Sequence, residues 1–160
     1  LIELLIALLI SGMIVAAVGT AIFQVFRVNT LTSDSVAAFA QVQNAGFWIS
    51  HDAHMAQAVT VDNDPGTPEF ITIDWVDWDN DAHRVVYTLN SSGELKRSYY
   101  TKPYGETDFS LNATLSIAQN IDPENTTCTW NGVVLTLNIT AQVGEQTANR
   151  TYIVESRPLS

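Results

Sequence analysis

The feature that most constrains this chain of 160 residues is an uninterrupted apolar run near its N-terminus. Residues 4–23 contain no ionisable side chain, and Glu3 is the only formal charge among the first 26 residues. A helix of this length extends about 30 Å at ~1.5 Å per residue, which equals the hydrocarbon thickness of a bilayer. A carboxylate beside such a run is costly unless it finds a partner, so Glu3 is a candidate functional residue.

The string LIELLIALLISG at residues 1–12 resembles the mature N-terminus of the type IV pilin superfamily. In that family an aromatic residue or Met and then Thr stand before this string, so we expect two residues to precede Leu1. The resemblance implies a subunit that lies in the inner membrane before assembly, is handled by a pilus assembly machinery including the prepilin peptidase, carries N-terminal methylation and forms a homo-oligomeric helical filament. Major pilins, minor pilins and secretion pseudopilins share the string, so it does not distinguish these three classes.

Three residues in or beside the apolar run carry expectations about assembly. The resemblance implies that Glu3 pairs with the N-terminal amine of a neighbouring subunit in an apolar setting, where low dielectric strengthens the attraction. The alternative is a helix N-terminal carboxylate stabilised by the macrodipole. Gly12 and Gly19 each disfavour helix by ~1 kcal/mol relative to Ala. In filaments of this family the matching stretch often loses helical hydrogen bonds, but the proline that usually follows is absent here, so both softening and an intact helix stay open.

An apolar stripe at helical spacing follows the run, formed by Phe39, Val42, Gly46, Ile49, Ala53 and Ala56. We therefore predict one helix from residue 1 to about 59, with softening near 29–35. Its first half is expected to be buried on every side by lipid or other helices, and its second half to pack one face on a domain. The turn residues Asp62-Asn63-Asp64-Pro65-Gly66 should end it.

Beyond this turn apolar residues alternate with period two, which predicts strands over 70–76, 84–89, 94–100, 128–130, 133–141 and 147–155. Residues 115–121 form an element whose type stays open. Asn131-Gly132 predicts a type I′ hairpin turn. In the strand after it, one face should be the core and the other wetter; the expected core residues are Val133, Leu135, Leu137 and Ile139, and the expected outer ones Val134, Thr136, Asn138 and Thr140.

The predicted fold is α+β, with a long N-terminal helix packed on a head made of a single antiparallel β-sheet. Residues 1–28 form the transmembrane and filament-core helix, 29–61 the amphipathic half of the helix, and 62–160 the head. The order of elements is also similar to that of J-type pseudopilins and PilW-like minor pilins, through Leu95-Lys96-Arg97 at the end of a hairpin and a last strand that closes on Arg157.

Five Asn-x-Ser/Thr sequons, all after residue 89, make glycosylation a second hypothesis; they are Asn90, Asn112, Asn125, Asn138 and Asn149. The alternative is a Thr-rich β-domain in which sequons arise by composition.

Two clusters of potential metal ligands are present. Asp77, Asp79 and Asp81, close to Asp74, resemble the start of a Ca²⁺ loop, but no turn glycine and no closing Glu follow, which favours a solvated turn between strands. His51 and His54 are three residues apart, yet no third ligand is evident, so an exposed helix face is favoured. We therefore predict no metal site and no cofactor.

Composition excludes other classes. With 17 acidic residues against 7 Lys and Arg, and a net charge of −10, the chain lacks the basic face that nucleic acid needs, so the monomer is not expected to bind it directly. The sole cysteine, Cys128, excludes an intramolecular disulfide; a buried thiol is favoured over pairing between chains. No catalytic triad, phosphate loop or paired catalytic carboxylates emerge, so we predict that the protein is not an enzyme.

The sequence therefore predicts a structural subunit of an extracellular type IV pilus-like filament that is membrane-inserted before assembly. A minor pilin or type II secretion pseudopilin is the alternative within the family. A monomeric membrane-anchored adhesin that binds sugar or calcium is the alternative from another class.

Overall fold

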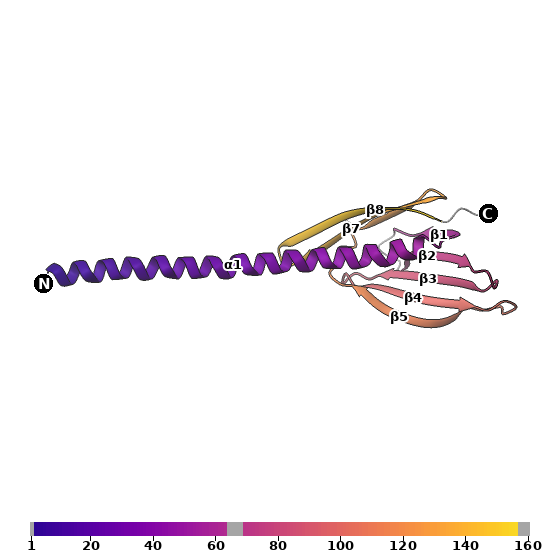
Figure 1. Cartoon of the computed structure of the whole chain (residues 1–160), viewed down its shortest axis with the longest axis horizontal. Helices are drawn as coiled ribbons and strands as arrows, with labels where there is room; N and C mark the ends of the chain where they lie inside the picture. Colours follow the sequence, from indigo (N-terminus) through magenta and orange to yellow (C-terminus); the bar gives the residue numbers. More distant parts are fainter. Residues whose placement is uncertain (1, 64–68, 157–160) are drawn as a thin grey trace.

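The protein consists of a long helix whose second half carries a β-rich head (Figure 1). The structure is a computed structural model and describes residues 2–63 and 69–156. Helix α1, Ile2–Ala53, projects from the head over its first half and lies against strands over its second half. The predicted α+β class, a long N-terminal helix packed on antiparallel β-structure, is confirmed.

The head contains two antiparallel sheets, so the prediction of a single sheet was wrong. The first sheet has the strand order β1-β2-β3-β4-β5 and the second β6-β7-β8. Their bounds are β1 Ala58–Val61, β2 Glu69–Val76, β3 Ala82–Leu89, β4 Leu95–Lys102, β5 Ser110–Ala118, β6 Thr127–Trp130, β7 Val134–Val143 and β8 Gln146–Glu155. Strand β5 resolves the element whose type the sequence left open.

The two sheets share one core because α1 lies between them. Ile71, Ile73 and Val85 of the first sheet and Leu135 and Leu137 of the second sheet all belong to the same buried cluster. A helix that is covered from two sides buries a wider stripe than a single sheet could cover, which is the physical reason for the second sheet.

An asparagine side chain joins the sheets at the point where β1 ends. Asn63 Nδ2 donates to the Cys128 carbonyl at 2.8 Å, and the Cys128 amide donates to Asn63 Oδ1 at 2.9 Å. One side-chain amide thus replaces a pair of ladder hydrogen bonds. Residues 64–66 of the predicted turn, and Arg157 of the predicted last strand, lie outside the described residues.

The buried face of α1 is displaced from the predicted stripe at its start. Val42, Gly46, Ile49 and Ala53 are buried as expected, but Phe39 is 45% exposed, and Ala38 takes the core position. Two turns further along, at Gly46, the helix lies too close to β8 for a side chain. At Gly46 an added Cβ would lie 2.0 Å from Cζ of Tyr152. The predicted softening at 29–35 is absent from the described helix, which is continuous there.

The helix ends at Ala53, six residues before the predicted end near residue 59. Residues 54–56 form a turn, in which the Met55 amide donates to the Asp52 carbonyl at 3.1 Å. Residues 58–61 then pair with β2. Ala56 is still buried, because the turn and β1 keep supplying the core after the helix has stopped. Helical spacing alone does not reveal that change.

Strand β7 has the predicted core face at Leu135, Leu137 and Ile139, each at most 1% exposed. Val133 was placed on that face wrongly, because it lies in the turn and is 59% exposed. Thr140, expected on the wetter face, is buried, and its hydroxyl donates to the Asn125 carbonyl at 3.0 Å.

The turn before β7 also differs from the predicted type. Of the two central turn residues only Gly132 has a positive φ, at 99°, whereas a type I′ turn requires a positive φ at Asn131 as well. Asn131 Oδ1 instead accepts from the amides of Val133 and Val134, at 3.0 and 2.7 Å. The asparagine thus stabilises the turn through its side chain.

Burial raises the pKa of the Cys128 thiol to about 12, and the thiol is buried as predicted. Because the thiolate is the reactive form, we expect Ellman's reagent at pH 8 to modify the chain only when it unfolds. Stability should also fall as pH rises above about 9, since the unfolded thiol then ionises while the folded one stays neutral. Labelling of the folded chain at the rate of a free thiol would contradict this packing, and Cys128→Ala is the control for the pH effect.

Candidate functional site: an exposed apolar stalk

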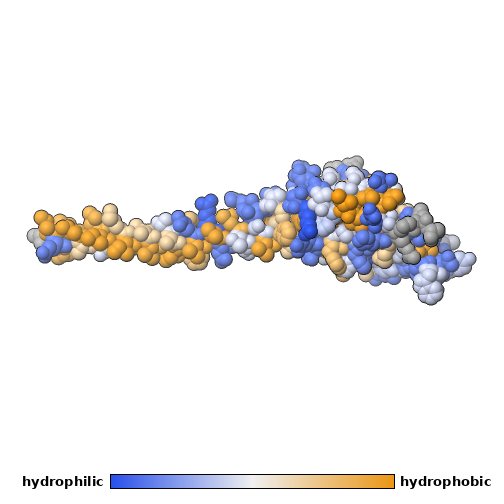
Figure 2. Space-filling view, turned by 45° about the horizontal axis from the view of Figure 1, so that its top comes forward, coloured by the Kyte–Doolittle hydropathy of each residue, from blue (hydrophilic) through white to orange (hydrophobic). Residues whose placement is uncertain are grey.

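The first half of α1 is an apolar surface that none of the described residues of the chain covers. All residues from 2 to 30 are exposed, including Leu4 and Phe23 at 69% each. Figure 2 shows this apolar stretch running along the stalk away from the head. Soluble monomers rarely expose a contiguous apolar patch beyond about 600 Å². This stalk, defined as residues 2–30, therefore needs lipid or other protein around it.

The hydroxyl groups of the stalk are satisfied within the helix. Ser11 Oγ donates to the Ala7 carbonyl at 2.8 Å, and Thr20 Oγ1 donates to the Ala16 carbonyl at 2.8 Å. Such bonds to the preceding turn allow hydroxyl groups to enter an apolar medium without a penalty for an unpaired donor. Among the described residues, α1 is the one helix long and apolar enough to span a membrane.

The helix is continuous through Gly12 and Gly19, and apart from the adjoining helix backbone a Cβ at either position would meet no atom of the described residues within 4 Å. Packing inside the chain therefore does not require these glycines. Small residues on an apolar helix allow another helix to approach closely. Whether this stretch softens in a filament stays a prediction.

Glu3 lies in the first turn of α1 and is exposed. The first basic residue after it is Arg27, 24 positions further along, which is about 36 Å in a helix. Glu3 forms no ion pair with any of the described residues. A cation for this carboxylate therefore has to come from outside residues 2–63 and 69–156.

A buried ion pair, which the sequence analysis missed, fixes the head to the second half of α1. Asp52 is fully buried, and Arg97 of β4 donates to both of its oxygens, from Nε at 2.7 Å and from Nη2 at 2.9 Å. The Tyr87 hydroxyl of β3 donates to the same carboxylate. Asp52 follows Ile49 at helical spacing, and Arg97 lies two residues after the inward-facing Leu95. These positions were the sequence signal that both charged residues point to the core.

The electrostatics of this cluster keep the Tyr87 hydroxyl protonated and the Arg97 guanidinium charged. Burial, and then the Asp52 charge, raise the pKa of Tyr87, so its hydroxyl remains a donor. Burial alone would lower the pKa of Arg97, but the hydrogen bond and charge of Asp52 outweigh it and raise that pKa. The guanidinium also lies 5.2 Å from the ring centroid of Trp48. Helix and sheet are thereby joined by a bidentate, charge-assisted contact.

The aspartates that resemble a calcium loop form the turn between β2 and β3. Asp77 Oδ1 accepts from the amides of Asp79 and Asp81, both at 3.0 Å, and Asp77 Oδ2 lies 3.0 Å from His83 Nε2. The hydrogen bond from His83 lowers the pKa of Asp77 more than any other contact. The Tyr104 amide donates to Asp81 at 2.8 Å. The carboxylates thus stabilise the loop itself.

His51 and His54 lie on one exposed face of the helix end. The ring of His51 stacks on Phe47, with centroids 6.2 Å apart, and His54 Nδ1 lies 3.2 Å from the Glu155 carbonyl oxygen. Asp52 between them faces the core and cannot serve as a third ligand. Across the part of the chain that the structure describes, no group of three or more His, Cys, Asp or Glu is placed to hold a metal ion.

The sequons are distributed over both sheets. Asn90 lies in the β3–β4 turn, Asn112 on β5, Asn125 in the loop before β6, Asn138 on β7 and Asn149 on β8. Asn138 is half-buried and the other four are exposed. The second sheet brings three of them close to Thr140: its hydroxyl contacts Asn149 and the Asn125 carbonyl, and Asn138 stands two residues before it.

Comparisons with protein-family models, with curated proteins and with solved structures each found no match. The functional argument therefore rests on the residues and their geometry: an exposed apolar stalk, a single carboxylate at its far end, and a head locked to the other half of the same helix.

Breaking the Asp52–Arg97 pair should destabilise the head severely. Asp52→Asn leaves the Arg97 guanidinium, whose side chain is 12% exposed, without a charged partner, and we expect a loss of about 3–5 kcal/mol. The matched control is Asp74→Asn, because Asp74 pairs with Arg84 at the surface, with side chains 32% and 41% exposed; its loss should stay below about 1 kcal/mol. Urea unfolding of the detergent-solubilised chain, followed by tryptophan fluorescence, measures both. Equal losses would show that the buried pair does not fix the head.

Proposed function

We propose that this chain is a structural subunit of an extracellular type IV pilus-like helical filament. The observation that carries the proposal is the stalk, a long apolar helical segment that is exposed on every side and bears one carboxylate near its end. In a filament, stalks of identical subunits would bury one another and the heads would face outward. Before assembly, lipid of the inner membrane would cover the same surface, and the pilus assembly machinery, including the prepilin peptidase, would act on the chain.

Glu3 supplies the register in this proposal. A carboxylate inside a bundle of apolar helices is stable only when it is paired, and the described part of its own chain offers no cation within reach. The N-terminal amine of a neighbouring subunit is a partner of the right charge. One pairing distance then sets the axial step between subunits.

The minor pilin or secretion pseudopilin remains the second candidate, because the Leu95-Lys96-Arg97 motif behind that resemblance contributes Arg97 to the buried cluster. Such a subunit would use the same stalk in a short assembly. Abundance along purified fibres separates the two: a major subunit is present along the whole length, and a priming subunit only at low copy number.

Replacing Glu3 with Leu should abolish or strongly reduce fibres while the subunit still accumulates in the membrane. The stalk stays apolar in this variant, so insertion is preserved, but the charge that sets the register is gone. Glu106→Leu, in an exposed loop, is the matched control and should form fibres normally. Sheared fibres and membrane fractions are compared by immunoblot. Normal fibre yield from Glu3→Leu would contradict the assigned role.

Glycans on the sequons should face outward from the fibre, because Asn90 lies in a turn and Asn138 and Asn149 lie on the side of their sheet opposite the core. We expect the intact mass of the native subunit to exceed 17.6 kDa, plus any residues beyond this sequence, by hexose-type increments that map to these asparagines. A mass that the polypeptide fully accounts for would show that the sequons arise from composition alone.

A further inference from the structure

The head ends in a strand with an open edge on each of its two sides. Strands β1 and β6 are joined through Asn63, so β5 and β8 are the outermost strands of the two sheets (Figure 1). Among the described residues, each of them pairs with a strand on one side only. One row of backbone N–H and C=O groups on each strand is therefore open to another strand.

Strand β5 has no charged residue and no proline to block its open edge. Its nine residues, Ser110–Ala118, are all uncharged, and the first seven of them are exposed. Its register with β4 shifts near each end, and residues 113–116 pair regularly between the shifts. Charged residues and proline are the usual means of preventing an edge from pairing. An open edge without them can bind an extended strand through backbone hydrogen bonds.

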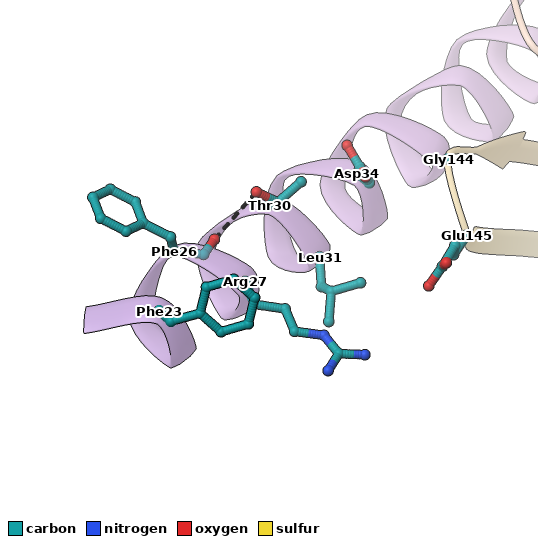
Figure 3. Close-up of a pocket in the computed structure, with 8 residues that line it drawn as sticks. All are labelled: Phe23, Phe26, Arg27, Thr30, Leu31, Asp34, Gly144 and Glu145. Atoms are coloured by element: carbon teal, nitrogen blue, oxygen red, sulfur yellow. Dashed lines mark hydrogen bonds between the residues drawn. The ribbon is translucent and has the colours of Figure 1, made fainter. Parts of the chain in front are cut away.

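Strand β8 runs along α1 and away from the stalk. It begins beside the stalk, where Gly144 lies so close to α1 that a Cβ on it would be 2.7 Å from Oδ2 of Asp34 (Figure 3). It ends near the end of the helix, where the Glu155 carbonyl oxygen lies 3.2 Å from His54 Nδ1. The helix between these two points is about 30 Å long, and ten strand residues span about 34 Å. The strand therefore follows the helix axis.

Strand β5 runs in the opposite direction. The amide of Gln119, the residue after β5, donates to Gln41 Oε1 at 2.8 Å, so the strand ends on the stalk side of the head. When two copies of the chain point their stalks the same way, β5 of one copy is antiparallel to β8 of the other. Antiparallel pairing is the slightly more stable arrangement of two strands.

We propose that in the filament the β5 edge of each head pairs with the β8 edge of a neighbouring copy, which joins the heads through backbone hydrogen bonds. This inference rests on the proposed function and adds the contact by which the heads bind one another. The two edges are different surfaces, so the contact is heterologous and can repeat from copy to copy. Pairing of β5 with β5 would instead stop at a dimer.

The points at which the strands meet α1 determine the displacement between paired heads. Strand β5 ends at the level of Gln41, and β8 begins at the level of Asp34, seven helix positions nearer the stalk. Full overlap of the two strands therefore requires the copy that supplies β8 to be displaced by about 10 Å in the direction from stalk to head. Copies displaced in this way cannot close a ring, so the assembly is helical.

Side chains at this register support the pairing. With Ala118 beside Gln146, antiparallel strands bring Leu111 beside Ile153, because each lies seven residues further along its strand. Leu111 is 57% exposed and Ile153 is 72% exposed. Both point away from α1, since their strand partners each stand next to a residue that faces the core. Pairing of the edges would place these two apolar side chains against each other.

Cross-linking in purified fibres tests the contact at this pair. The chain carries Leu111→Cys and Ile153→Cys together with Cys128→Ala, and sheared fibres are treated with a short bismaleimide that reaches opposite and diagonal neighbours, ~5–8 Å apart. We expect a denaturing gel to show a ladder of dimers, trimers and higher multimers. The detergent-solubilised subunit should stay monomeric, because within one head the two residues lie on opposite edges.

Two controls establish which edges meet. Leu111→Cys alone should give no dimer, and a dimer from it would show β5–β5 pairing and overturn the proposal. Thr129→Cys in place of Ile153→Cys is the matched control. Thr129 is exposed and lies in line with Ile153 through Thr136, two strands or ~10 Å further from the edge. Equal ladders from the Thr129 and Ile153 pairs, or no ladder from the Ile153 pair, would also overturn it.

Hydrogen exchange tests the same contact without any substitution. The outward amides of residues 110–116 and 146–155 should exchange about ten-fold more slowly in fibres than in the detergent-solubilised chain, because pairing gives them acceptors. The β4–β5 loop, residues 103–109, is the internal control and should exchange equally in both states. Unchanged exchange in β5 and β8 would overturn the proposal even where a cysteine variant does not assemble.

The outcome is separable from that of the filament proposal. If fibres show helical order with this chain as their subunit, but neither a ladder nor slower exchange in β5 and β8, the edge-pairing proposal fails alone. If the chain forms no fibres, both the filament and the pairing of its heads are contradicted.

Discussion

Every part of this molecule depends on one constraint, which is that the stalk cannot remain in water. Burial of apolar surface gives roughly 25 cal/mol per Å², and the stalk exposes its large side chains on all sides. The hydroxyls of Ser11 and Thr20 donate back to the helix backbone, so these groups do not oppose transfer to an apolar setting. Glu3, the one carboxylate of the stalk, lies at the far end, where a neighbouring subunit would reach it in the proposed filament. In the proposed function, lipid covers this surface first and other stalks cover it later.

One continuous helix is exposed over its first half and packed in the core of the head over its second half, and the head begins where this change occurs. From Ala38 onward α1 packs against two sheets with a common core, and Asp52 binds the helix to β4 through Arg97. This buried pair ties the direction of the stalk to the head. Forces applied to stalks inside an assembly would therefore be transmitted to the heads.

The sequence predicted the parts of the fold that depend on local periodicity. The long helix and the core face of β7 follow from spacings of 3.6 and two, and Glu3 stands out because an isolated charge in an apolar run is conspicuous without any structure. Tertiary contacts decided the rest. Ala38 rather than Phe39 faces the core, α1 stops at Ala53 where the chain turns into β1, and the partner of Asp52 is seen only once Arg97 lies beside it. The pairing of strands into two sheets also depends on such long-range contacts.

The central claim is that stalks pack against one another in a helical filament, and cryo-electron microscopy of fibres sheared from producing cells tests it most directly. The account predicts helical order with this chain as the repeating subunit, the first halves of α1 in contact along the axis without intervening lipid, and Glu3 near the N-terminus of a neighbouring subunit. Fibres without this chain, a core in which lipid separates the helices, or a subunit found only as a monomer in the membrane would contradict it.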